Sequence, residues 1–158
     1  MRVAILVLAL LAVAQCDTTR MMMMNLNLSS VPQKLINCAG DGAPYTSIQF
    51  DDNVTLISPP KKGANLGIEA TGTALTDVTI DHVNLTAFSK NADGSFTSLQ
   101  VIPIKDGQVI AAGGPLDWKF GYYAPGFIPT GDYKIQFEFF APDATTLDCN
   151  YVLVRFDD

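Results

Sequence analysis

The sequence has few of the side chains on which most catalytic and metal sites depend. Its 158 residues include one histidine and three cysteines, and 10 basic against 16 acidic residues give a net charge of −6. A metal site built from imidazole and thiolate needs more ligands than this. The acidic balance also lacks the basic footprint of a nucleic-acid-binding protein. We therefore expect no metal, no cofactor and no nucleic-acid partner.

Catalytic signatures are scarce as well. His82 is the only imidazole that could act as the base of a nucleophilic triad, with Asp81 and Ser89 as partners on paper. The Gly-x-Ser-x-Gly turn that presents a serine nucleophile is absent. A position at the surface or at a strand edge, next to a bulge, accounts for His82 without a catalytic role. We expect a protein that is not an enzyme.

Long hydrophobic runs are limited to the amino terminus. After Met1-Arg2, the segment Val3–Ala14 is 12 apolar residues long. A bilayer span needs about 20 residues, whereas a short apolar core behind a positive start is typical of a signal peptide. We assign residues 1–16 to a signal peptide, with cleavage after Ala14 or Cys16. The protein is then expected to be secreted or to lie in a lysosomal or endosomal lumen.

Removal of the signal peptide leaves two cysteines, Cys38 and Cys149. In an oxidising compartment two cysteines are more often paired than free, so a disulfide is favoured over two separate buried thiols. Three N-x-Ser/Thr sequons fit the same compartment and make Asn27, Asn53 and Asn84 candidate glycosylation sites.

The remainder divides into a short segment and one domain. Residues 17–34, which include Met21–Met24, show no sustained periodicity and predict a flexible N-terminal segment; a copper(I) site at the methionines is the sharper alternative. From Leu35 to Asp158, short runs rich in Val, Ile, Thr, Tyr and Phe alternate with turn residues. The pattern predicts an all-β, two-sheet, immunoglobulin-like sandwich of about seven or eight strands.

Particular strands and turns can be placed within this domain. A change of apolar parity at Asp81-His82 predicts a bulge, and Asn91–Gly94 predicts a hairpin turn. Period-2 alternation is clearest in residues 133–139 and 151–156. A loop with exposed-looking apolar groups, 123–129, follows the alternating aromatics of 118–122; it either folds back onto the core, rims a ligand mouth or touches a membrane.

Several stretches together resemble a known family. They are Gly114–Tyr122, Ile128–Ile135, Leu147-Asp148-Cys149 before Val152–Phe156, an early Cys38 with Ile48–Phe50, and Ser58–Leu66. In order and spacing the sequence resembles the ML lipid-recognition superfamily over roughly residues 36–157. That superfamily includes Niemann–Pick-type sterol carriers and phosphatidylglycerol/phosphatidylinositol transfer proteins.

The resemblance implies a secreted sandwich that holds a lipid tail in an apolar cavity between its sheets, with Cys38–Cys149 as the bridge between first and last strands. Many members carry two further disulfides, which this chain lacks. The candidate pocket lining is Phe50, Trp118, Phe120, Ile135, Phe137, Phe139 and Val154. The candidate pocket mouth and membrane contact is Tyr122, Tyr123, Phe127 and Ile128.

We therefore expect a monomeric, secreted lipid-binding protein that carries a phospholipid or a sterol between membranes through transient surface contact. Lys61 and Lys62 either meet an anionic head group or are simply solvated. The alternative function is a secreted sandwich module that recognises a protein or glycan surface, with a fully packed interior and no bound lipid.

Overall fold

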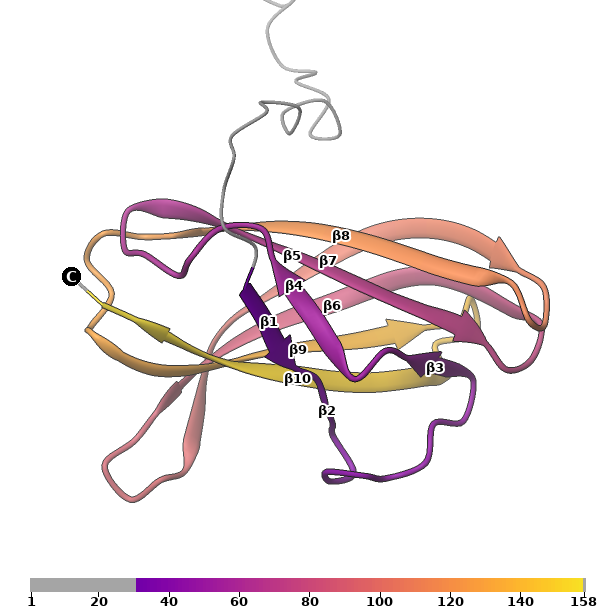
Figure 1. Ribbon diagram of the computed structural model, residues 1–158, viewed down its shortest axis with the longest axis horizontal. Helices are drawn as coiled ribbons and strands as arrows, with labels where there is room; N and C mark the ends of the chain where they lie inside the picture. The colour runs from indigo at the N-terminus through magenta and orange to yellow at the C-terminus, as the bar shows by residue number, and fades with distance from the viewer. Residues whose placement is uncertain (1–30, 158) are drawn as a thin grey trace, which may run out of the picture.

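The computed structural model describes residues 31–157, and all of its regular structure is β-strand (Figure 1). The ten strands are β1 (Val31–Lys34), β2 (Ile36–Asn37), β3 (Ile48–Phe50), β4 (Asn53–Leu56), β5 (Ala64–Ala74), β6 (Val78–Lys90), β7 (Phe96–Ile110), β8 (Pro115–Ala124), β9 (Gly131–Phe140) and β10 (Thr146–Phe156). No helix long and apolar enough to cross a membrane occurs in this part of the chain.

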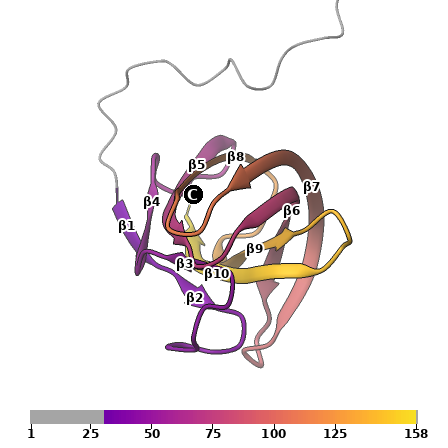
Figure 2. The same ribbon diagram turned by 90° about the vertical axis from the view of Figure 1, so that its right-hand side faces the viewer.

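The strands form two five-stranded antiparallel sheets. In the first, β8 pairs along one edge of β5, and β3 and β4 share the other edge, with β1 outside β4. The second has the order β2-β10-β9-β6-β7. Seen end-on, β1 and β4 lie on one side of the molecule and β7 on the other (Figure 2). The predicted all-β sandwich is confirmed.

Strict alternation along the central strands builds the core between the sheets. In β9, Tyr133, Ile135, Phe137 and Phe139 are buried while the residues between them are half-buried. Successive side chains of a strand point to opposite faces, so this pattern gives one face to the interior and one to solvent. Burial of the inner face supplies the main stabilisation of the sandwich.

The close approach of β3 to β5 depends on a glycine. A Cβ at Gly72 would lie 2.6 Å from the carbonyl oxygen of Gln49. The ladder that pairs Phe50 with Gly72 therefore leaves no room for a larger residue.

The predicted turn and bulge are present. The β6–β7 hairpin turns at Asn91–Gly94, where the Gly94 amide donates to the Asn91 carbonyl at 3.0 Å, and the β6 register shifts between Ile80 and His82. The predicted signal peptide, Met21–Met24, Cys16 and Asn27 lie outside the described residues. Val31–Lys34, placed by the sequence in the flexible segment, form β1.

The disulfide joins Cys38, just after β2, to Cys149 in β10, with their Cα atoms 5.4 Å apart. The backbone amide of Cys38 also donates to the Cys149 carbonyl at 3.0 Å. The predicted pairing of these two cysteines is confirmed.

Candidate functional site

Aromatic side chains from both sheets meet in the interior. Trp118 of β8 lies 5.3 Å from Phe137 and 5.5 Å from Phe139, measured between ring centroids, and Phe50 of β3 lies 5.2 Å from Phe139. The two Trp118 contacts are edge-to-face, an arrangement that adds to the stabilisation from burial. All of the predicted pocket-lining residues except Phe120 are buried, and Phe120 is partly exposed. In this structure their side chains fill the space between the sheets.

One side of the sandwich is not closed by hydrogen bonds. β7 and β8 are the end strands of the two sheets, joined by the turn 111–114, and among the described residues no ladder pairs them (Figure 1, Figure 2). We call this line of contact the β7–β8 seam. Apolar side chains along it, Ile102 and Ile104 from β7 and Phe120 and Tyr122 from β8, pack against the core but stay partly exposed.

The predicted pocket mouth is split between a strand and a loop. Tyr122 and Tyr123 belong to β8, which continues through Ala124, and Tyr123 is 58% exposed. In the β8–β9 loop, Phe127 is 88% exposed whereas Ile128 packs against the core. Burial raises the pKa of Tyr122, with a smaller contribution from Tyr133.

The β8–β9 loop is fastened to the end of the sandwich. The Tyr133 hydroxyl donates to the Pro129 carbonyl at 2.7 Å, and Lys62 donates to the Thr130 hydroxyl at 2.9 Å. The Gly63 amide donates to the Ala124 carbonyl at 2.8 Å. Phe127 is therefore displayed to solvent by a loop whose flanks are held in place, next to the Lys61-Lys62 pair.

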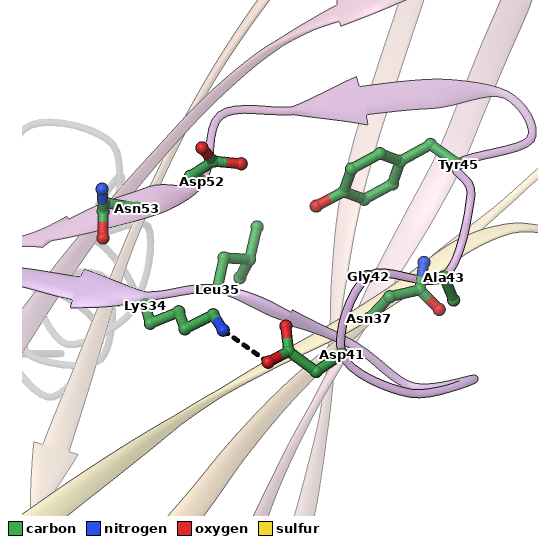
Figure 3. Close-up of a pocket in the computed structure, with 9 residues that line it drawn as sticks. All are labelled: Lys34, Leu35, Asn37, Asp41, Gly42, Ala43, Tyr45, Asp52 and Asn53. Atoms are coloured by element: carbon green, nitrogen blue, oxygen red, sulfur yellow. Dashed lines mark hydrogen bonds and ion pairs between the residues drawn. The ribbon is translucent and has the colours of Figure 1, made fainter.

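Two surface hollows lie away from the seam. One has a volume of about 440 Å³ and is lined by Lys34, Leu35, Asn37, Asp41, Gly42, Ala43, Tyr45, Asp52 and Asn53; we call it the Tyr45 pocket (Figure 3). The other, of about 460 Å³, includes Phe96, Leu153 and Val154 in its wall. Of the predicted lipid-contacting residues only Val154 lines either hollow.

A buried polar cluster was not predicted. Asp148 and Asn150 of β10 are 6% and 0% exposed, and the Asp148 Oδ2, Asn150 Nδ2 and Asn150 Oδ1 atoms meet no partner within hydrogen-bond geometry in the described part of the chain. Burial is the main cause that raises the pKa of Asp148, although the nearby amides, including Asn150, act in the opposite direction. The signal in the sequence was an asparagine at the inward parity of Val152 and Val154.

The other candidates occupy ordinary positions. His82 Nδ1 lies 2.9 Å from Asp81 Oδ2 and its ring stacks on Phe140 at 4.8 Å. Ser89 is seven positions along the same strand, roughly 23 Å away, so the structure does not assemble a triad. Of the two described sequons, Asn53 is exposed and Asn84 is half-buried.

Comparison with solved structures agrees on the fold. A Niemann-Pick type C2 protein from Japanese carpenter ant superposes with a TM-score of 0.54 at 11% identity, covering 77% of this chain and 97% of the other. Spo0M, a sporulation control protein from Bacillus subtilis, gives 0.55 at 9% identity, covering 72% of this chain and half of that protein. No protein-family model and no curated protein matches the sequence. The first of these likenesses supports an ML-like fold.

Proposed function

We propose that this protein is a non-catalytic lipid carrier that holds an acyl chain or a sterol between its two sheets, which it reaches through the β7–β8 seam. The observation that carries the proposal is the seam itself. Apolar side chains of both sheets remain partly exposed there, between two edge strands that are not hydrogen-bonded to each other. The resemblance of the sequence to the ML superfamily and the ML-like fold support the same function.

The energetics favour such a ligand if the sheets separate along the seam. Each buried methylene of a lipid contributes about 0.8 kcal/mol, so a tail of about ten carbons contributes several kcal/mol after ordering costs. Trp118, Phe137 and Phe139 fill the interior in this structure, so the tail has to displace their rings. The Trp118–Phe120 stack, at 5.8 Å, lies beside the seam and would be the first contact.

The exposed Phe127 and Tyr123 provide the proposed membrane contact. An aromatic side chain on a convex loop can insert at the level of the lipid head groups, where aromatic residues are favoured. Lys61 and Lys62 adjoin this loop and would add attraction to anionic lipid. Transfer would then consist of docking by the loop, followed by passage of the tail along β8.

The test uses the single tryptophan as a position-specific reporter. Trp118 is the only tryptophan in the chain and is 4% exposed, so a quencher reaches it only from inside the sandwich. The secreted protein is first examined by native mass spectrometry and lipid extraction. It is then mixed with vesicles of phosphatidylcholine whose acyl chains carry bromine, and with unbrominated vesicles. Greater quenching by the brominated lipid is expected.

Two variants make the result specific. Phe120→Ser alters the seam, whereas Phe140→Ser alters a partly buried phenylalanine on the outer face of β9, where it stacks on His82. Loss of bromine-dependent quenching in the first variant and its retention in the second would support the inter-sheet site. Co-purified lipid without quenching would place the lipid elsewhere. Absence of both would refute the carrier and favour the surface-recognition module.

A further inference from the structure

The Tyr45 pocket lies on the side of the sandwich opposite the β7–β8 seam, so the proposed lipid site does not use it. Its walls come from the β1–β2 segment, the 38–47 loop and the turn between β3 and β4. At about 440 Å³ it has the size of a small-molecule site. Figure 3 shows the Tyr45 hydroxyl pointing across the hollow toward Leu35 and Asp52, with Lys34 and Asp41 closing one side.

Three polar side chains around the pocket are available to a ligand. Within residues 31–157, no hydrogen bond involves the Tyr45 hydroxyl, the Asp52 carboxylate or the side-chain amide of Asn53. Burial, followed by the charges of Asp148, Asp52 and Asp51, raises the pKa of Tyr45. The Tyr45 hydroxyl therefore stays protonated as a donor, Asp52 accepts, and Asn53 does both.

The charge of the pocket selects against anions. Lys34 and Asp41 form an ion pair with each other. Asp52 then remains as an uncompensated carboxylate in the lining, which repels an anionic ligand. The described residues contain no group of three or more side chains that could hold a metal ion. A neutral ligand that offers several hydroxyls, with an apolar face for Leu35 and the Tyr45 ring, fits this lining.

The inner wall of the pocket is backed by the buried polar cluster. Asn37, which lines the pocket, donates to Asp148 Oδ1 at 3.5 Å and faces Asn150 directly across the β2–β10 ladder. Directly opposed residues of an antiparallel pair have side chains on the same face. The unpartnered polar atoms of Asp148 and Asn150 therefore lie behind this wall, where an apolar core would be more stable. Asn37 therefore connects the lining of the pocket to the buried polar cluster.

We propose that the Tyr45 pocket binds a neutral polyhydroxylated ligand of about the size of one monosaccharide, hydrogen-bonded by Tyr45, Asp52 and Asn53. The same chemistry is offered by a free sugar, a glycan terminus or the polyol head group of a lipid. Binding here is independent of the seam, so the two sites can be tested apart.

The experiment is saturation-transfer NMR with glucose, mannose, galactose, N-acetylglucosamine and myo-inositol as separate probes. Asn53 is the acceptor residue of the sequon Asn53-Val54-Thr55, and a glycan attached there would cover the pocket. The assay therefore uses the full secreted protein carrying Thr55→Ala, which removes the sequon and keeps the Asn53 side chain. Saturable binding of at least one probe is expected. Tyr45→Phe and Asp52→Ala should each weaken it roughly tenfold, as loss of one hydrogen bond to a ligand hydroxyl predicts.

Controls distinguish the possible sources and the competing ligand. Tyr151→Phe, at a half-buried tyrosine on the outer face of β10, should leave binding unchanged. Equal affinity for free galactose and for vesicles that contain the neutral glycolipid galactosylceramide, in the Phe120→Ser background, would support a head-group source, whereas preference for the free sugars would support a glycan. Binding of choline in place of every sugar, or binding of no probe, would overturn the proposal without bearing on the lipid carrier.

Discussion

Replacement of Asn150 by leucine is expected to stabilise the protein. The Asn150 side chain is fully buried on the inner face of β10, and its Nδ2 and Oδ1 meet no hydrogen-bond partner in the described residues. An unsatisfied buried polar group costs about 1–3 kcal/mol, and an apolar side chain of similar size removes that cost. Some weak interaction with Asp148 is lost, because the Asn150 amide helps to lower the pKa of that carboxyl.

The net expectation is a gain of about 1–2 kcal/mol in the free energy of unfolding, or roughly 3–8 °C in Tm for a domain of this size. Urea unfolding of the oxidised protein, followed by Trp118 fluorescence, measures it. Asn37→Leu is the matched control, because Asn37 Oδ1 accepts from the Ala39 amide at 2.9 Å and the variant should lose about 1 kcal/mol. A loss of stability in Asn150→Leu as large as in Asn37→Leu would show that the amide is partnered and would refute the reasoning.

Three further predictions concern the disulfide, the hairpins and the buried carboxyl. Reduction of Cys38–Cys149, which spans 111 positions, should lower the free energy of unfolding by about 4–5 kcal/mol in urea titrations with and without reductant; an unchanged midpoint would contradict this. The turns at 91–95 and 141–145 share one hydrogen-bond pattern, but Gly94 has φ 86° where Ala144 has φ 64°. Ala144→Gly should therefore stabilise and Gly94→Ala destabilise by about 1 kcal/mol each, and thermal melts that move in the same direction would refute the strain. The folded-state pKa of Asp148 is raised above its ordinary 3.8, so the folded protein binds a proton more tightly than the unfolded chain does. The free energy of unfolding should therefore fall as the pH rises from 3.8 through the folded-state pKa. Asp148→Asn should flatten this part of the stability–pH profile; a profile identical to the parent's would count against a raised pKa.

The strands that could be predicted are those whose own pattern defines them. In β9, the alternation from Tyr133 to Phe139 sets both the strand and its buried face before any partner is known. β1 has no such pattern: it is four residues long, contains Pro32, and exists because β4 pairs with it from Asn53 to Leu56. Proline is tolerated there because β1 is an edge strand.

The candidate sites divide in the same way. The interior aromatics could be named from parity, but parity does not tell a packed core from a ligand cavity, and here the rings are in contact. The Tyr45 pocket could not be predicted at all, because an irregular loop and the β3–β4 turn bring Asn37, Tyr45 and Asp52 together. No periodicity relates such positions, so only the folded chain places them side by side.

The two sides of the sandwich are held by different means, and this difference bears on where it can open. On the β1–β2 side the chain passes directly from one sheet to the other between Lys34 and Ile36, and the disulfide fixes β2 to β10 at that point. On the β7–β8 side the two sheets are connected through the turn 111–114, with side-chain packing but no ladder along the strands. Along the strands, separation of the sheets is therefore opposed on one side by the direct β1–β2 crossover, whose β2 end the disulfide anchors to β10, and on the other side by apolar side-chain contacts. Those apolar contacts are the ones a lipid tail replaces. The disulfide side acts as the fixed edge, so opening at the seam should enlarge the space around Trp118 while leaving the Tyr45 pocket intact.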